Sequence, residues 1–199
     1  MLPEIRPAIV STVLFTLLLG VAYPLAITAV SKVAFPYQAG GSLVRDDNGR
    51  VIGSVLIAQP FAKAEYLHPR PSAAGPNGYD ASGSSGSNDG PLSPALLKRV
   101  RSAAAALRAS TGHDQIPDDA VTASGSGLDP DISPAYAELQ ADRIAKARGA
   151  PAEAVRKVIA GQTRGPVLGF LGQPRVNVLA TNLALDKALP CPMKSGESA

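Results

Sequence analysis

The feature that most constrains this chain is an uncharged run near its N-terminus. Residues 7–31, PAIVSTVLFTLLLGVAYPLAITAVS, include no charged side chain. As an α-helix rising about 1.5 Å per residue, the run would be about 37 Å long, enough to cross a hydrocarbon core of roughly 30 Å with some tilt. Pro24 is expected to kink the helix near its far end. The sequence therefore predicts a transmembrane anchor helix over 7–31, preceded by an N-terminal flank over 1–6.

The alternative interpretation of the same run is a cleaved signal peptide, with AVS at 29–31 as the cleavage site. The run is longer than the usual 7–15 residues of a signal core, which favours an uncleaved anchor. Arg6 and the terminal amine lie on one side and Lys32 on the other, a bias that favours a cytoplasmic N-terminus. We therefore expect a single-pass protein with an extracytoplasmic domain over 32–189 and a tail over 190–199.

The composition of the whole chain is that of a folded protein. Of 199 residues, 45% are hydrophobic and 18% charged, which suits one globular domain plus an appendage. Cys191 is the only cysteine, so an intrachain disulfide and a multi-cysteine metal site are excluded. The two histidines, His68 and His113, have no partners at metal-ligand spacing, so no metal site is expected.

Turn and cap signals predict the elements of this domain. Residues 41–60 indicate a β-hairpin with arms at 42–44 and 51–57, because the sequence DNG at 47–49 tolerates positive φ. Serine followed by proline at 93–94 and again at 133–134 predicts two helix starts.

The second of these helices is expected to run to about Arg148 and to end at Gly149. A short helix is expected over 151–160, closed by Gly161, and residues 175–189 begin like a strand and then become ambiguous. The fold class is thus α+β: one N-terminal transmembrane helix followed by a mixed α/β extramembrane domain with a small antiparallel sheet.

Basic residues in the helix that starts at Ser93 do not indicate nucleic-acid binding. Lys98, Arg99, Arg101 and Arg108 lie mostly opposite the apolar face, and no aromatic residue interleaves with them. They are interpreted as a solvated helix face.

The region 66–91 contains no periodicity, and two interpretations of it remain open. Its glycine, serine and proline content is typical of a flexible linker. A pure spacer does not need its larger polar side chains, which favour an ordered loop. These are Tyr66, His68, Arg70, Tyr79 and Asp80.

The stretch VTASGSGLDPDISPAY at 121–136 raises the question of a nucleophile, a phosphate cradle or a turn. A nucleophile elbow needs glycines two residues either side of the serine, and Ser126 has Ser124 and Leu128 there. No lysine follows the glycines, so a Walker loop is not formed. We interpret the serines as shaping a rigid turn and capping the helix at Ser133. The acidic residues Asp114, Asp118 and Asp119 lack calcium-loop spacing and are expected in a solvated loop.

Several motifs in fixed order resemble the C subunit of the bacterial Kdp potassium-transporting P-type ATPase. They are RPA at 6–8, GSLV at 41–44, GSVLIAQPF at 53–61, YLHPRPSAA at 66–74, SSGSNDGP at 84–91, VTASGSGLDPDISP at 121–134, QADRIAKARG at 140–149 and VNVLATNLALD at 176–186. Together they cover nearly the whole chain.

The resemblance implies a non-catalytic accessory subunit of an ATP-driven potassium uptake complex in the bacterial inner membrane. Its partners would be a channel-like potassium-binding subunit, a P-type ATP-hydrolysing subunit and a small single-span subunit, with potassium handled by those partners. The family has been proposed to raise the ATP affinity of the hydrolysing subunit. An extracytoplasmic domain argues against that role, because ATP is bound in the cytoplasm, and no nucleotide site is assigned.

The resemblance also points to docking through the anchor and the loops 66–91 and 121–134. The motif residues implied are Tyr66, His68, Arg70, Ser72, Ser87, Asn88, Ser124, Gly125, Ser126, Gly127, Asp129, Gln140, Arg143, Asn177 and Asn182. The alternative from another class is a membrane-anchored extracytoplasmic serine hydrolase or other envelope enzyme, since Ser124, His68 and Asp129 can be assembled into a triad on paper.

Overall fold

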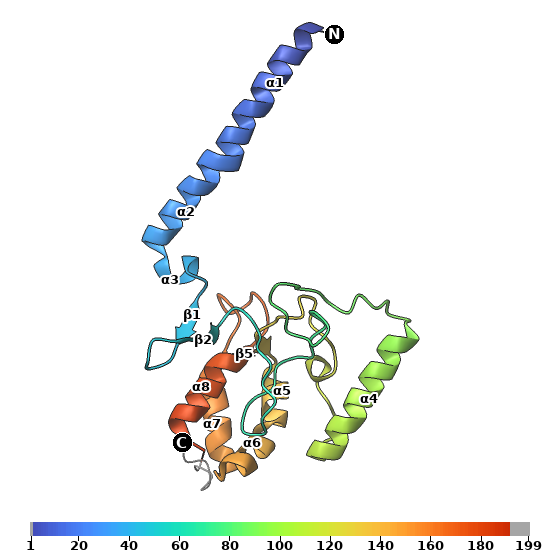
Figure 1. Ribbon diagram of the computed structural model, residues 1–199. Coiled ribbons are helices and arrows are strands. Elements are labelled where there is room, and N and C mark those ends of the chain that lie inside the picture. The colour runs from blue at the N-terminus through green and yellow to red at the C-terminus, as the bar shows by residue number, and fades with distance from the viewer. Residues whose placement is uncertain (1, 192–199) are drawn as a thin grey trace. The chain divides into compact units, whose positions relative to one another are not determined.

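The structure is a computed structural model that describes residues 2–191 (Figure 1). Contacts between residues divide the chain into two compact units, Met1–Ile52 and Gly53–Ala199. The first unit holds the apolar helix and the start of a hairpin, and the second holds the α+β domain.

The N-terminal helix consists of α1 (Leu2–Leu17), a π-helical turn (Leu18–Ala22) and α2 (Tyr23–Ala34). The stretch Pro3–Ala34 is the one helix in the described chain that is long and apolar enough to cross a membrane, with a mean hydropathy of 2.2. A kink is predicted at Pro24, and the structure has a π-helical turn just before that residue. A proline ring clashes with the carbonyl four residues earlier, and a wider turn relieves that contact.

A short helix, α3 (Pro36–Ala39), leads into the predicted β-hairpin, whose strands are β1 (Leu43–Arg45) and β2 (Val51–Ser54). Asp46 accepts hydrogen bonds from two backbone N–H groups of the turn through one carboxylate oxygen, and Gly49 has φ +76°. The hairpin is confirmed, but its second arm ends at Ser54 instead of continuing to residue 57.

A three-stranded antiparallel sheet lies in the second unit, in the order β3 (Asp131–Ile132), β5 (Arg175–Asn177), β4 (Thr163–Arg164). Val176 is opposite Ile132 on one side and Thr163 on the other, and it is fully buried. The central strand, with Val176 and Asn177 both buried, is therefore the most buried of the three.

The helices of this unit are α4 (Pro94–Thr111), α5 (Pro134–Leu139), α6 (Ala141–Arg148), α7 (Ala152–Gln162) and α8 (Val178–Ala188), with a 3₁₀ turn at Asp118–Ala120. Both predicted caps are confirmed, because the hydroxyls of Ser93 and Ser133 accept hydrogen bonds from Leu96 N–H and Tyr136 N–H. The core that these elements enclose includes Leu67, Ile132, Ala137, Ile144, Val155, Ile159, Val176 and Leu185.

The single helix predicted from Ser133 to Arg148 is wrong: it is two helices separated at Gln140. The Gln140 N–H donates to Ala137 O, three residues back, and its side-chain amide is engaged by the backbone of His68. At Gln140 the tertiary contact with His68 therefore outweighs helical propensity.

Two other boundaries also differ from the prediction. Helix α7 continues through Gly161 to Gln162, because the chain stops being helical only where Thr163 enters the sheet. The ambiguous stretch 175–189 resolves into β5 and α8, with Asn177 as the helix cap.

Candidate functional site

The segment around Leu67 runs through the core without belonging to a sheet, because amide side chains replace a neighbouring strand. Leu67 N–H donates to Asn182 Oδ1 at 2.7 Å, and Asn182 Nδ2 donates back to Leu67 O at 3.0 Å. Gln140 binds His68 in the same way: His68 N–H donates to Gln140 Oε1 at 2.8 Å, and Gln140 Nε2 donates to His68 O at 3.2 Å. Both backbone groups of two successive residues are thus satisfied by side chains, as burial requires.

Two arginines bind the carbonyls just before that segment. Arg143 donates to Ala64 O and Tyr66 O, and also to Gln140 Oε1 at 2.7 Å. Arg148, only 3% exposed, donates to Glu65 O.

The remaining donors of Arg148 reach the C-terminal helix. They bind Leu189 O and Asp186 Oδ1, each at 2.8 Å, and the guanidinium lies over the Tyr66 ring at 5.3 Å from its centroid. Tyr66 in turn donates its hydroxyl to Asp186 Oδ2. The motif containing Tyr66 and Leu67 is therefore an ordered element locked to α6 and α8.

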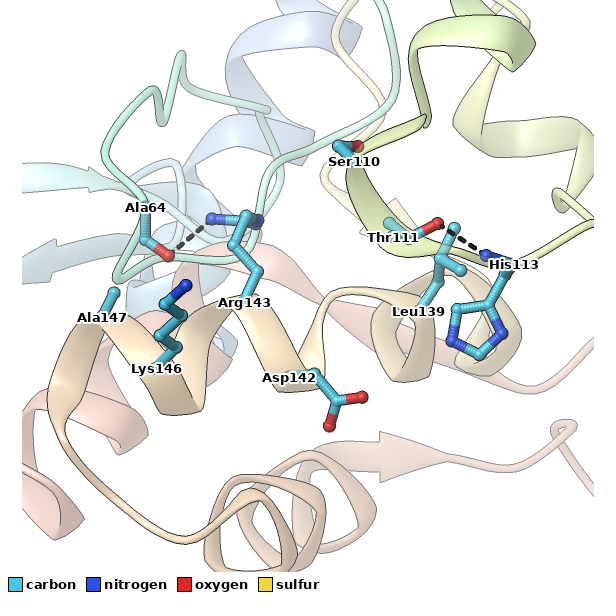
Figure 2. Close-up of a pocket in the computed structure, with 9 residues that line it drawn as sticks. All are labelled: Ala64, Ser110, Thr111, His113, Leu139, Asp142, Arg143, Lys146 and Ala147. Atoms are coloured by element: carbon cyan, nitrogen blue, oxygen red, sulfur yellow. Dashed lines mark hydrogen bonds between the residues drawn. The ribbon is translucent and has the colours of Figure 1, made fainter. Parts of the chain in front are cut away.

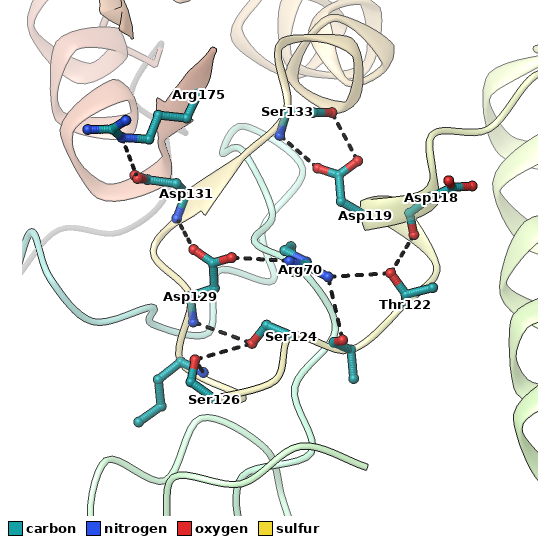
Figure 3. A network of polar contacts seen from close by, with 12 residues as sticks. Arg70, Asp118, Asp119, Thr122, Ser124, Ser126, Asp129, Asp131, Ser133 and Arg175 are labelled. Atoms are coloured by element: carbon teal, nitrogen blue, oxygen red, sulfur yellow. Dashed lines mark hydrogen bonds and ion pairs between the residues drawn. The ribbon is translucent and has the colours of Figure 1, made fainter. Parts of the chain in front are cut away.

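Arg70 ties the same chain segment to the loop at 121–131 (Figure 3). Its Nη1 contacts Asp129 Oδ2 at 3.1 Å, and its Nη2 donates to Thr122 Oγ1 and Ala123 O. Asp129 Oδ1 accepts from the N–H of Asp131, so one carboxylate joins the arginine to the first strand of the sheet.

A second link between the two loops passes through Ser72. Its hydroxyl donates to Gly127 O at 2.6 Å and accepts from the N–H groups of Ala74 and Tyr79. Gly127 has φ +67°, and a Cβ there would lie 2.5 Å from Ser85 O and 2.7 Å from the Ala74 Cβ. Only glycine fits at this point of contact.

The turn at 124–128 is a structural turn, as predicted. Ser126 Oγ accepts from Leu128 N–H at 3.1 Å, and Ser124 Oγ lies 3.5 Å from both Ser126 Oγ and Asp129 N. Within residues 2–191, neither serine hydroxyl has a histidine partner, and the ring of His68 contacts Lys63 O. The assembly that acyl transfer needs, a nucleophile bonded to a base, is not formed by these side chains.

Other predicted residues have different roles. Asn177 caps α8 through Oδ1, and its Nδ2 donates to Val55 O and Asp131 Oδ1, each at 2.9 Å. Gly125 is exposed, and its carbonyl would lie 2.9 Å from a Cβ added at Gly86. Ser87 and Asn88, by contrast, form no hydrogen bond within the described part of the chain.

Three residues that the sequence analysis did not single out for these roles complete the networks. Arg148 gave no sequence signal for its role, because it is in the last turn of a helix, where a basic residue is usually solvated. Asp131 holds Arg175 by an ion pair of 3.1 Å. Asp119, predicted in a solvated loop, instead accepts from both the N–H and the hydroxyl of Ser133, which corrects that prediction.

Burial shifts the pKa values of two side chains in this region. Burial, with Arg143 nearby, lowers the pKa of His68, so its neutral form is favoured. Burial raises the pKa of Tyr136 to about 12. Both shifts favour the neutral form of the side chain, because burial in a protein interior penalises the charged form.

An open pocket of about 590 Å³ lies between the C-terminal end of α4 and the side of α6 (Figure 2). Arg143 lines it, but its donors are turned to Ala64 and the neighbouring carbonyls. Lys146 and Asp142 are exposed side chains of opposite charge on α6. Among the described residues no group of three or more His, Cys, Asp or Glu side chains could hold a metal ion.

Taken together, these contacts define a class of protein: an α+β domain, following one apolar N-terminal helix, whose polar residues bind loops to the core. Comparison with known proteins identifies the family. The family model described as KdpC, K+-transporting ATPase, c chain, matches residues 5–187, and the chain belongs to this family. It is a non-catalytic subunit of a potassium-transporting ATPase.

The relatives match over almost their whole length. The potassium-transporting ATPase KdpC subunit of a Caulobacter species is 63% identical over 196 residues, covering 98% of this chain and 100% of the relative. The KdpC subunit of Beijerinckia indica is 58% identical, covering 96% of both chains. That of Geobacter sulfurreducens is 50% identical, covering 94% of this chain and 99% of the relative.

Proposed function

We propose that this chain is an accessory subunit that docks on the other subunits of an ATP-driven potassium uptake complex and is needed for their assembly. The observation that supports this most is the full-length match to KdpC subunits. Further support comes from motif residues such as Arg70 and Ser72, which hold the loops in fixed positions, as a rigid docking module requires.

The docking surface we propose is formed by two neighbouring loops, 82–90 and 124–127, here called the double-loop surface. Ser85 N–H donates to Ser126 O at 2.9 Å, and the Ser84 hydroxyl donates to the same carbonyl. The two loops are thus joined to each other. Asn88 is exposed with φ +52°, a conformation that asparagine tolerates.

The free polar groups of this surface support an intermolecular role. Ser87 and Asn88 satisfy no partner inside the described chain, so their hydrogen bonds are available to another protein. A rigid backbone under free side chains lowers the entropy lost on binding. This contrasts with Ser72 and Ser124, whose hydroxyls are used internally.

We further propose that the N-terminus is cytoplasmic and the α+β domain extracytoplasmic. The support is the bias of Arg6 and the terminal amine against Lys32. In that orientation the domain lies on the side from which potassium is taken up, and a direct contact with cytoplasmic ATP is not expected. Protease added to intact spheroplasts should digest the domain beyond Lys32, and protection of the domain would contradict this orientation.

The docking proposal is tested by co-expressing the chain with the other Kdp subunits and purifying through a tag on the hydrolysing subunit. Ser87→Arg is expected to reduce the amount of this chain retained, because a long charged side chain is placed on the double-loop surface. Ser102→Arg, on the exposed side of α4, is the matched control. Equal retention of both variants would refute the assignment of this surface. The ATP concentration dependence of the purified complexes, measured in parallel, tests whether loss of the chain changes ATP affinity.

A further inference from the structure

The loop between β4 and β5 carries apolar side chains that are exposed to solvent. Val167, Leu168, Phe170 and Leu171 are exposed by 54%, 78%, 74% and 50% of their surface. We call residues 165–173 the apolar tip. Several large apolar side chains exposed on one loop indicate a contact that the isolated chain does not show.

The backbone of the apolar tip is closed on itself. Val167 N–H donates to Leu171 O and Leu171 N–H donates to Val167 O, each at 2.9 Å. Gly169 N–H donates to Pro166 O, and Phe170 N–H donates to Val167 O. A segment that enters an apolar phase must satisfy its polar backbone groups internally, because no water is there to do so. The apolar tip meets much of that requirement.

Leu168 has φ +54°, a left-handed conformation that a leucine adopts only with strain. Asparagine or glycine would relieve the strain at no loss to the core, since the side chain points outward. A strained residue that makes no core contact is explained when its side chain is needed elsewhere. The leucine is therefore informative about function.

The charges around the apolar tip match a lipid surface. Residues 165–174 carry no charge, and Arg164 and Arg175 bracket them. Arg164 is exposed and forms no ion pair within the described residues. Arg175 is paired with Asp131, so the basic side chain offered to a partner is that of Arg164. An apolar insertion with a basic side chain beside it suits an interface of acyl chains and anionic headgroups.

The apolar tip is also close to the first residues of the α+β domain. Soon after the anchor the chain enters the α+β domain, where Val55 O accepts from Asn177 Nδ2 at 2.9 Å. Asn177 ends β5, the strand that starts at Arg175 directly after the apolar tip. The tip is thus one short strand, β5, away from the residue that binds Val55 at the start of the domain.

We propose that the apolar tip inserts into the interfacial layer of the same membrane that holds the N-terminal helix, with Arg164 at the level of anionic headgroups. The domain then has a second attachment to the bilayer, which restricts its orientation on the tether. This proposal depends on the anchor helix and not on docking to the other Kdp subunits.

The test uses the full chain alone, reconstituted in lipid nanodiscs, whose two faces are both open to solutes. Cys191→Ser removes the native thiol, and Phe170→Cys carries an environment-sensitive fluorophore. Leu92→Cys, at a position 90% exposed in another loop, is the matched control. Each probe is exposed in turn to aqueous iodide and to nitroxide-labelled lipid.

At residue 170 we expect quenching by the nitroxide lipid and iodide quenching reduced about threefold or more relative to residue 92, as for a group within the interface. Leu168→Asn should weaken the lipid quenching while leaving the unfolding midpoint unchanged or higher, because it relieves strain. Phosphatidylglycerol should strengthen the lipid quenching over phosphatidylcholine, and Arg164→Gln should remove that difference.

Equal iodide access at residues 170 and 92 would overturn the proposal. Protection from iodide without lipid quenching would overturn it as well, because the tip would then be covered by a second copy of the chain. Protection that develops only after the other Kdp subunits are added would assign the tip to a protein partner instead.

Discussion

The most informative perturbation is Asn182→Leu, which preserves the approximate size of a fully buried side chain while removing its polar groups. Asn182 is 1% exposed, and its amide satisfies both the N–H and the carbonyl of Leu67, itself fully buried. The substitution leaves two buried backbone groups without partners.

The magnitude follows from that pair. Each unsatisfied buried group costs about 1–3 kcal/mol, so the loss should be about 2–6 kcal/mol in the free energy of unfolding. Against a total of roughly 5–15 kcal/mol for a typical domain, the variant should be severely destabilised. Asn77→Leu is the matched control, because Asn77 is exposed and forms no hydrogen bond within the described residues; it should change stability by less than about 0.5 kcal/mol.

The assay is urea unfolding of the full chain in detergent, followed by circular dichroism, together with hydrogen exchange at the Leu67 amide. Asn182→Asp adds a specific signature. Its carboxylate can accept from Leu67 N–H but faces Leu67 O with its second oxygen, and burial with that repulsion should raise its folded pKa. Stability of this variant should therefore increase as pH falls through that pKa. A loss of less than about 1 kcal/mol in Asn182→Leu would refute the reasoning, since it would mean that Leu67 finds other partners.

Three further predictions concern other parts of the networks. Gly127→Ala should destabilise the domain by well more than the roughly 1–2 kcal/mol that a left-handed alanine costs, because the new Cβ collides with Ser85 O. Gly112→Ala is the control: Gly112 has φ +72° and open space around it, so this variant should lose only the conformational part. Equal losses of the two variants in urea unfolding would contradict the packing argument. Arg148→Met should lower the free energy of unfolding by about 2–6 kcal/mol, because the carbonyls of Glu65 and Leu189 lose their partner. Asp186→Asn should cost less, because the Asp186 carboxyl is partly solvated. The reverse order of the two variants in thermal unfolding would contradict this prediction. Burial lowers the pKa of His68 in the folded state, so its contribution to stability is complete above about pH 6.5 and is lost as the pH falls toward the folded pKa. His68→Gln should therefore flatten the dependence of the unfolding free energy on pH in that window. An unchanged slope would show that another group titrates there.

The local signals of the sequence determined much of this protein. An uncharged run long enough for a bilayer predicts the helix containing Pro3–Ala34, whatever the rest of the chain does. Serine followed by proline fixed the starts of α4 and α5, because a cap hydroxyl and a preset φ act within one turn of helix. The hairpin turn with Gly49 was equally local, and motifs in fixed order indicated the family.

The tertiary structure decided where side chains act on backbone far away in the sequence. Gln140 interrupts a helix to bind His68, and Asn182 serves Leu67 as a neighbouring strand would. Arg148 has the pattern of a solvated base at a helix end, yet it is buried and donates to Glu65 O. No spacing rule predicts such contacts, because a buried backbone group accepts any suitable partner that the packing of the core brings within hydrogen-bond distance.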